Sequence, residues 1–453
     1  MAIGNLLGVP GFLYRAAWSL AGPLAAPLAW GNGKLARAIR GRRGASARMV
    51  GWAADGRDRS RPLVWFHAAS VGEGRQAEAV IVRLRSARPE WQVAYTFGSA
   101  SAERFAAGLP ADFQGFVPLD TVGETGRALE ALEPTALVFS ATDVWPELVR
   151  QAARRQVRVA LISATLAPTS SRRGALARAF LGGAYRALDR VGATDEADAR
   201  ALAALGVDAR RIVVTGDTRH DAAHARAGRV DRRSPALRAL TGGGDGYQTV
   251  VAGSTWPGDE RALLFAHAEV RGARGPRLVI APHEPTPRHL AALEDRIAHA
   301  VGADAVVRRL SDLERETNGA PSDTPWEICL VDRVGVLADL YAIAAIAYVG
   351  GGFHRAGLHS VIEPAALGVP VLFGPHWESS RDARLLLETG GGWSAKNQAQ
   401  LAAALDRWLH DETARADAGA AARAVVEQGL GAAERSLQLV IHLVETQNPR
   451  PTT

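Results

Sequence analysis

Cysteine and lysine are both scarce in this chain of 453 residues. Cys329 is the only cysteine, so no intramolecular disulfide can form, which is typical of proteins of the cytosol. Lys34 and Lys396 are the only lysines, and nearly all of the positive charge is therefore carried by arginine. Together with abundant alanine and glycine, this bias indicates a GC-rich genome more than a particular function.

Several motifs that would assign a function directly are also missing. There is no zinc-ligand spacing, RNA-binding signature, heptad run, Gly-x-Ser-x-Gly elbow or Walker loop. His354 and His359 lie five positions apart without an obvious third ligand, so we expect no bound metal. The formal net charge of +6 suits anionic partners, but without those signatures we expect no nucleic acid among them.

Short apolar strands alternate with amphipathic helices from Pro62 onward, a pattern typical of parallel, doubly wound α/β sheets. Residues 222–244 are rich in Arg, Ala and Gly and predict a linker. We therefore expect two Rossmann-like domains, 34–225 and 226–453, with a cleft between them and ligands at the carboxyl ends of the strands. The strands are expected at 63–67, 93–96, 116–118, 136–140, 157–163, 190–194, 212–215, 248–252, 277–281, 305–308, 327–331, 343–349 and 369–373.

Residues 1–33 form an apolar segment that three prolines interrupt, and residues 16–33 carry no charged side chain. An apolar segment followed by basic residues predicts attachment to an anionic membrane surface. A hydrophobic helix packed on the domain is one alternative. A signal peptide is another, although its positive charges should come first. The basic residues are Lys34, Arg37, Arg40, Arg42, Arg43 and Arg48.

The stretch from Ile346 to Pro375 has the clearest local pattern. A buried strand ends in three glycines at 350–352, and a short helix at 362–367 follows, for which Ser360 is a suitable N-cap. Glycines at such a turn let backbone N–H groups bind an anion, typically phosphate. Glu363 can accept hydrogen bonds from two sugar hydroxyls, so the stretch predicts a nucleotide-sugar site, with a simple tight turn as the alternative.

Three other loops of the second half also follow expected strands. The loop at 253–255 includes Ser254, which can hold a phosphate through its hydroxyl and N–H groups. The loop at 282–284 includes His283, which can stack on a nucleotide or can be merely structural. The loop at 332–336 offers backbone contacts. With the glycine turn, these loops predict one binding edge.

Three residues of the first half follow strands in the same way. Glu73 can take a proton from an attacking hydroxyl, or it can favour the first turn of its helix. Asp143 can polarise an acceptor, or it can cap the helix that begins at Pro146. Arg219 can bind a phosphate or a sugar carboxylate, or it can be a solvated interdomain charge.

Five motifs carry a family resemblance. They are His67-Ala-x-Ser-Val-Gly-Glu73, Thr142-Asp-Val-Trp-Pro146, Thr215-Gly-Asp-Thr-Arg219-x-Asp221, Ala252-Gly-Ser-Thr255 and Gly357-x-His-x-x-x-Glu363-Pro-Ala-Ala-Leu-Gly-Val-Pro-Val-Leu-Phe-Gly-Pro-His376. In this order, between about residues 62 and 390, they resemble the motifs of the 3-deoxy-D-manno-octulosonic acid (Kdo) transferases. The apolar N-terminus with its basic flank is also similar to theirs.

The resemblance implies an α/β glycosyltransferase of the GT-B type, with two Rossmann-like domains facing a central cleft and a membrane-associated N-terminal segment. It implies transfer of Kdo from CMP-Kdo to a lipid A precursor (lipid IVA) in lipopolysaccharide biosynthesis, at the cytoplasmic face of the bacterial inner membrane. No cofactor or metal is expected, because the donor has a single phosphate.

The resemblance also implies roles for individual residues. Glu73 is the general base, and Asp143 and Arg219 stabilise the transition state. The residues expected to bind the nucleotide sugar, together with the phosphate ligand Ser254, are Pro282, His283, Val334, Gly335, Val336, Ser360, Val361, Ile362 and Glu363.

The chain departs from the family pattern at several of these positions. Ala141 and Asp143 stand where the family has glutamates, Arg219 replaces a lysine and Ser360 replaces an asparagine. The loop that begins at Pro282 lacks the family's arginine. The nucleotide-binding half is the better preserved.

Two other functions fit the same residues. A related GT-B nucleotide-sugar transferase or a UDP-sugar epimerase would share the fold, although epimerases usually lack an apolar N-terminal anchor. The missing carboxylate at Ala141 also allows a catalytically weak, membrane-bound nucleotide- or lipid-binding protein. A preference for UDP over CMP would favour the first, and lipid binding without transfer would favour the second.

Overall fold

The computed structural model describes Tyr14, Gly31 and residues 33–167, 170–241, 247–271, 275–317, 325–355 and 357–446. The chain divides into two compact units: residues 1–222 with 429–453, and residues 223–428. The expected membrane segment at 1–33 lies outside the described residues, apart from three positions. Within the ranges just given, no helix is both long enough and apolar enough to cross a membrane.

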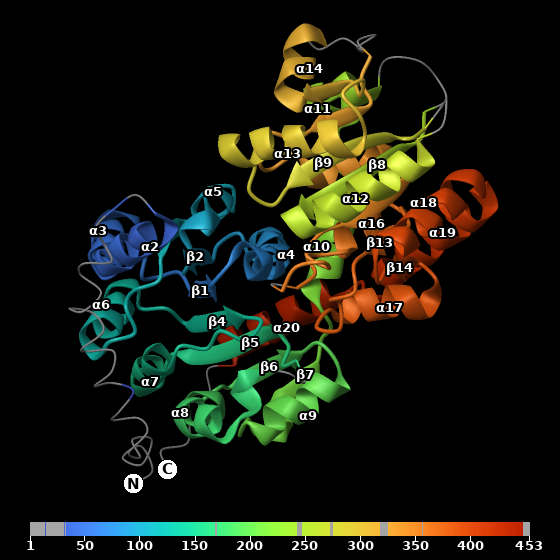
Figure 1. Ribbon diagram of the computed structural model, residues 1–453. Coiled ribbons are helices and arrows are strands. Elements are labelled where there is room, and N and C mark those ends of the chain that lie inside the picture. Colours follow the sequence, from blue (N-terminus) through green and yellow to red (C-terminus); the bar gives the residue numbers. More distant parts are fainter. Residues whose placement is uncertain are drawn as a thin grey trace. The chain divides into compact units, whose positions relative to one another are not determined.

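The first unit is built on a parallel sheet of seven strands in the order β3-β2-β1-β4-β5-β6-β7. The chain proceeds from β1 to β3, returns to the other side of β1 with β4, and continues to β7. Helices cover both faces (Figure 1). The strands are β1 (Leu63–Ala68), β2 (Gln92–Phe97), β3 (Phe113–Phe116), β4 (Ala136–Ser140), β5 (Arg158–Ala164), β6 (Arg190–Ala193) and β7 (Ile212–Val214).

Consecutive residues of β1 point to opposite faces of this sheet, as the strand period of two requires. Leu63 and Trp65 belong to one buried hydrophobic cluster, and Val64 and Phe66 belong to the other. The helices are α2 (Lys34–Arg43), α3 (Ala45–Gly56), α4 (Val71–Ala87), α5 (Glu103–Ala106), α6 (Val122–Leu132), α7 (Pro146–Arg154), α8 (Ala175–Arg186), α9 (Glu196–Ala204) and α10 (Thr218–Ala227), which runs into the second unit.

The C-terminal helix α20 (Ala432–Glu445) belongs to this first unit. Its residues Leu437 and Val440 pack in the same cluster as Val64 of β1. The sequence-based boundary placed residues 429–453 in the second domain instead. The prediction missed this because only the folded sheet shows which surface covers the apolar face of a helix.

The second unit contains another parallel sheet of seven strands, in the order β10-β11-β9-β8-β12-β13-β14. The strands are β8 (Thr249–Thr255), β9 (Arg277–Pro282), β10 (Val307–Arg309), β11 (Ile328–Leu330), β12 (Ile346–Val349), β13 (Val371–Phe373) and β14 (Gly392–Ser394). The helices are α11 (Pro235–Thr241), α12 (Pro257–Val270), α13 (Pro287–Ala300), α14 (Leu310–Thr317), α15 (Leu337–Leu340), α16 (Ile362–Ala366), α17 (Arg381–Thr389), α18 (Gln398–His410) and α19 (Glu412–Gln428).

The two doubly wound parallel sheets that the sequence predicts are confirmed, with local corrections. The strand expected at 116–118 is β3, because residues 113–116 pair in register with Ala94–Phe97. The glycine-rich strand β14 was not expected, since it lacks an apolar run. The expected linker at 222–244 contains part of α10 and all of α11, which buries Leu237 and Leu240.

The glycines after β12 are required by close backbone contacts. A Cβ atom on Gly350 would lie 2.3 Å from the carbonyl oxygen of Ser254, and one on Gly351 would lie 2.2 Å from that of Gly357. Gly351 also has a φ of +95°, which side chains disfavour. Neither Gly350 nor Gly351 therefore has room for a side chain.

Gly350→Ala should destabilise the second unit by about 1–3 kcal/mol, the usual cost of overpacking, because a backbone carbonyl blocks the new methyl group. Gly51→Ala is a matched control in the middle of α3, where no atom lies within 4 Å of the added Cβ. It should stabilise the protein by up to about 1 kcal/mol. Calorimetry measures both changes, and an unaltered transition in Gly350→Ala would contradict the close packing.

Candidate functional site

Each sheet contains a point where the order of strand addition reverses, and predicted site residues follow the strands at these points. In the first sheet Glu73 follows β1 and Asp143 follows its neighbour β4. In the second sheet β8 lies between β9 and β12; Ser254, His283 and Glu363 lie at or beyond the carboxyl ends of these strands. Ligands of open α/β sheets bind at such positions.

Glu73 lies in the first turn of α4, where it forms a capping box with Ser70. Its Oε2 accepts hydrogen bonds from the backbone N–H (3.0 Å) and the hydroxyl (3.2 Å) of Ser70. Burial and then the charge of Asp143 raise the pKa of Glu73, despite these hydrogen bonds. The structural role that the sequence offered, in the first turn of the helix, is therefore confirmed. A raised pKa makes a carboxylate a stronger base, and the role of Glu73 as general base stays a prediction.

Asp143 does not cap the helix that follows it. The N-cap of α7 is Trp145, which makes no side-chain capping bond. The carboxylate of Asp143 instead pairs with Arg172, whose guanidinium also donates to the hydroxyl of Thr142 (3.1 Å). Asp143 and Arg172 expose 27% and 34% of their side chains, so a polar substrate can reach this ion pair.

Trp145 fixes the loop of Asp143 to the core through a buried histidine. The indole Nε1–H donates to Nε2 of His67 (2.9 Å), and Nδ1 of His67 contacts the hydroxyl of Thr96 (3.0 Å). Burial, with the charge of Arg42, lowers the pKa of His67 to about 3, so the ring is neutral at physiological pH. Arg42, expected in a membrane-binding cluster, places its guanidinium 4.3 Å from the centre of the Trp145 ring.

Arg219 is held by a buried acid in its own motif. Its Nε and Nη2 donate to Oδ2 of Asp217 (2.8 and 2.6 Å), while Gln76 of α4 donates to Oδ1 (3.0 Å). Burial raises the pKa of Asp217, but the charge and hydrogen bonds of Arg219, helped by Gln76, bring it down to about 2. Arg219 still exposes 37% of its side chain, so its guanidinium can also meet an anion.

The predicted donor-binding loops of the second unit follow four strands that are successive neighbours, β11, β9, β8 and β12. Ser254 is half-buried, with a φ of +56°. Pro282 is buried and His283 is exposed. In the loop after β11, Val334 and Gly335 are exposed and Val336 is the N-cap of α15. Val361 and Ile362 are buried at the start of α16.

The anion bound by the glycine turn is an internal carboxylate. Asp259 is buried; its Oδ2 accepts from the N–H of Gly351 (2.9 Å), and its Oδ1 from the N–H of Phe353 (3.0 Å) and the hydroxyl of Tyr348 (2.8 Å). The N–H of Gly350 donates to Gly253 in the strand ladder (2.8 Å). The expectation that these N–H groups bind phosphate is therefore wrong for Gly350 and Gly351.

An aromatic stack lies beside this turn. Trp256 stacks on His354, with ring centres 4.2 Å apart, and on His283 at 4.7 Å. His283 also stacks on His359 at 4.7 Å, and the indole Nε1–H of Trp256 donates to Nε2 of His359 (3.2 Å). One loop from each of β8, β9 and β12 contributes to this cluster.

The helix α16 begins at Ile362, as expected, but Ser360 is not its N-cap, because the residue directly before the helix is Val361. The Ser360 hydroxyl donates instead to Oε2 of Glu363. Ser360 is exposed and Glu363 is half-buried. The two side chains therefore form one polar group at the binding edge.

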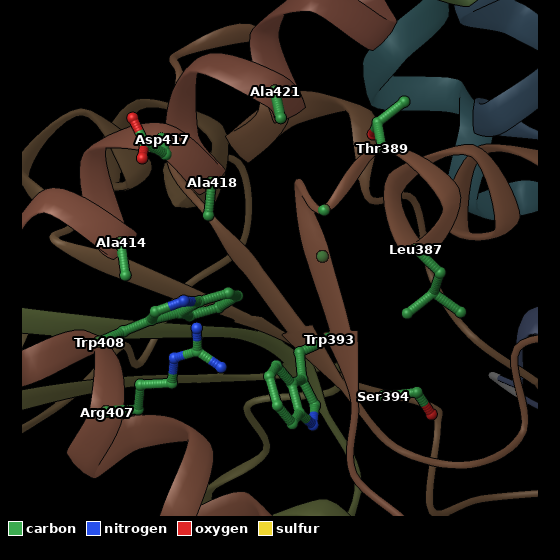
Figure 2. A pocket seen from close by; sticks show the side chains of 12 residues that line it. Leu387, Thr389, Trp393, Ser394, Arg407, Trp408, Ala414, Asp417, Ala418 and Ala421 are labelled. Atoms are coloured by element: carbon green, nitrogen blue, oxygen red, sulfur yellow. The ribbon is translucent and has the colours of Figure 1, made fainter. Parts of the chain in front are cut away.

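A separate cavity of about 610 Å³ lies at the β14 edge of the second unit (Figure 2). Trp393 and Arg407 lie close together there, with the guanidinium 5.6 Å from the ring centre. None of the predicted site residues lines this cavity. Among the residues with described positions, no group of three His, Cys, Asp or Glu side chains is arranged to hold a metal ion.

Sequence reasoning missed four residues that contact the candidate site residues or the glycine turn: Arg172, Asp217, Trp256 and Asp259. Asp259 has a recognisable signal, since Pro257 at the start of α12 and an acid two residues later are typical of a capped helix. Asp217 lies within a quoted motif. Arg172 has no signal, because it lies 29 residues from Asp143 in a separate loop.

The chain is similar in sequence to proteins named as 3-deoxy-D-manno-octulosonic acid transferases. A family model described as 3-deoxy-D-manno-octulosonic-acid transferase (kdotransferase) matches residues 42–222. The 3-deoxy-D-manno-octulosonic acid transferase of Bordetella pertussis is 30% identical over 385 residues, covering 83% of this chain and 86% of that protein. The enzyme of the same name from Haemophilus influenzae is 26% identical over 390 residues, with the same coverage.

Among solved structures, a putative UDP-N-acetylglucosamine 2-epimerase from Listeria monocytogenes is similar with a TM-score of 0.60. It shares 15% sequence identity, and the match covers 86% of this chain and 98% of that one. At such low identity the likeness shows the fold alone.

Asp143→Asn should lower the pKa of Glu73, because the negative charge of Asp143 raises it. The value should remain above that of a free glutamate, since burial is the larger cause and is retained. Carboxyl ¹³C chemical shifts followed through a pH titration measure the change. Asp208→Asn is a control, because Asp208 does not act on Glu73. An equal shift in both variants would contradict the coupling.

Proposed function

This chain belongs to the 3-deoxy-D-manno-octulosonic acid transferase family, and we propose that it transfers Kdo from CMP-Kdo to a lipid A precursor, lipid IVA, in lipopolysaccharide biosynthesis. Glu73 removes the proton from a hydroxyl of the lipid-linked glucosamine. That oxygen then forms a bond to the anomeric carbon of Kdo as the bond to CMP breaks. The products are the Kdo-bearing lipid and CMP.

The observation that carries this proposal is the environment of Glu73. A helix N-terminus and Ser70 hold its carboxylate in one place, while burial and the charge of Asp143 raise its pKa. A base needs a fixed position and a pKa above that of an ordinary carboxylic acid. Arg219 and the pair of Asp143 with Arg172 supply charges that can orient the acceptor or stabilise the transition state.

We assign donor binding to the second unit. His283, the exposed member of the aromatic stack, provides a ring of the kind on which a nucleobase stacks. Ser360 and Glu363 provide a hydroxyl and a carboxylate for the ribose, and the hydroxyl of Ser254 is suited to a phosphate oxygen. The exposed backbone at Val334 and Gly335 can contact the edge of the base.

Attachment to an anionic membrane surface is the remaining part of the proposal. The helices α2 and α3 expose the apolar side chains of Leu35 and Val50. They also expose four arginines: Arg37, Arg40, Arg43 and Arg48. Cationic and apolar groups together suit binding to anionic lipid at the cytoplasmic face of the inner membrane, where a lipid acceptor is found. We propose that no metal takes part.

Glu73→Gln should abolish transfer while leaving the fold and CMP binding intact. Glutamine keeps the capping box but cannot accept a proton at neutral pH. Because the folded-state pKa of Glu73 is raised, the wild type loses stability as pH rises, and the Gln variant should have the higher melting temperature at pH 8 but not at pH 4. Glu73→Ala is the comparison that also loses the hydrogen bond from the Ser70 backbone N–H to the side chain at position 73. Full turnover by Glu73→Gln would sink the assignment.

The function itself is tested by incubating the protein with CMP-Kdo and tetraacylated lipid A precursor, followed by mass spectrometry of the lipid. We expect addition of Kdo, unaffected by EDTA. The missing carboxylate at Ala141 left the alternative of a catalytically weak binding protein. Binding of the lipid by the protein, with no sugar added to it in this assay, would favour that alternative. Tighter binding of UDP than of CMP would favour a different nucleotide sugar.

A further inference from the structure

Within the residues that the structure describes, two buried or half-buried histidines accept a hydrogen bond from a tryptophan, one in each unit. In the first unit Trp145 donates to Nε2 of His67 (2.9 Å), and in the second Trp256 donates to Nε2 of His359 (3.2 Å). An indole Nε1–H can only donate, so Nε2 is the acceptor in both rings. A neutral imidazole that accepts at Nε2 carries its proton on Nδ1.

The two histidines differ in what their second nitrogen meets. Nδ1 of His67 donates to the hydroxyl of Thr96 (3.0 Å), so the whole ring is satisfied within the core. For His359, no group in the described part of the chain accepts a hydrogen bond from Nδ1. In the first unit, both ring nitrogens of His67 are therefore used in hydrogen bonds within the protein. In the second unit, the same kind of tryptophan–histidine hydrogen bond leaves the Nδ1–H of His359 as a donor for a ligand.

The surroundings of His359 are those of the binding edge. Its ring stacks on His283, it precedes Ser360 in the chain, and its backbone N–H donates to the carbonyl of Gly350 (3.0 Å). The titratable groups that face it are His283, His354 and Asp259. Burial, followed by the effect of His283, lowers its pKa to about 4, so it is neutral under working conditions.

We propose that Trp256 fixes the tautomer of His359 so that its Nδ1–H donates to an anionic oxygen of the bound nucleotide sugar. Trp256 acts through His359 and is a positioning residue for donor binding. The inference deepens the proposed function and rests on it, because the donor supplies two anionic groups, the phosphate and the carboxylate of the sugar. A neutral donor held in one orientation binds such an oxygen without a change of protonation.

Trp256→Phe tests this because it keeps a ring for stacking but removes the N–H. In ¹⁵N-histidine spectra of the full chain, we expect His359 to change from the Nδ1–H form to a mixture of tautomers. The Kd for CMP should rise about three- to tenfold, and that for cytidine, which has no phosphate, should change less than about twofold.

Trp145→Phe is the matched control from the first unit. It removes the same kind of hydrogen bond and should lower the melting temperature, because the buried Nε2 of His67 loses its partner. It should leave the Kd for CMP unchanged. Equal weakening of CMP binding in both tryptophan variants would overturn the inference, since it would indicate a general loss of stability.

Substitutions of His359 provide an independent measurement if Trp256→Phe folds poorly. Asparagine places an amide N–H near the position of Nδ1, whereas alanine removes it. His359→Ala should raise the Kd for CMP about tenfold, and His359→Asn should recover a large part of that loss. Identical affinities for the two variants would contradict a donor role for Nδ1.

The ligands distinguish the two sources of the anion. Weaker binding of CMP assigns the contact to the phosphate; an unchanged Kd for CMP with a raised KM for CMP-Kdo assigns it to the sugar carboxylate. Equal effects on CMP and cytidine would overturn the anion assignment.

If the wild type binds no CMP, the proposed function itself fails. If it binds CMP and Trp256→Phe alters neither affinity nor tautomer, only this inference fails.

Discussion

The buried carboxylate of Asp259 holds together the predicted binding edge of the second unit. It accepts hydrogen bonds from the backbone of Trp256 (2.9 Å), Gly351 and Phe353, and from the hydroxyl of Tyr348. These partners lie on β12, on the glycine turn and just before α12. A buried charge is tolerated only when it is fully paired, so the glycine turn, the start of α12 and the end of β12 are constrained as one group. The aromatic stack depends on this arrangement, because Asp259 holds the backbone of Trp256 and that of Phe353, the residue before His354.

The first unit uses a comparable arrangement around α4. Gln76, one turn beyond Glu73, donates to Asp217, and the hydroxyl of Thr218 donates to the carbonyl oxygen of Gln76 (2.9 Å). The hydroxyl of Ser140 at the end of β4 donates to the carbonyl of Glu73 (3.1 Å). Two chain segments, the end of β4 and the start of α10, are thus tied to the first two turns of one helix. This explains how residues distant in sequence form a preorganised group of charges.

The departures from the family pattern have a physical context in this structure. Ala141 is buried with a φ of +64°, so a side chain there starts from a strained backbone position. Arg219 donates twice to Asp217 through Nε and Nη2, which a lysine with a single ammonium group does not reproduce. The pairing of Asp143 with Arg172 also involves a partner from another loop. The changed residues in the first unit are therefore embedded in local networks of charge.

The sequence by itself determined the two parallel sheets, the order of their strands along the chain, and the loops at the carboxyl ends that carry Glu73, Asp143 and His283. Hydrophobic periodicity and glycine positions are local signals, and they suffice for these features. Only the tertiary structure decided that α20 packs on a face of the first sheet, that Asp259 accepts a hydrogen bond from the glycine turn, and that Trp256 donates to one nitrogen of His359. Each of these depends on groups brought together by folding from positions far apart in the chain, and no local pattern encodes which donor meets which acceptor.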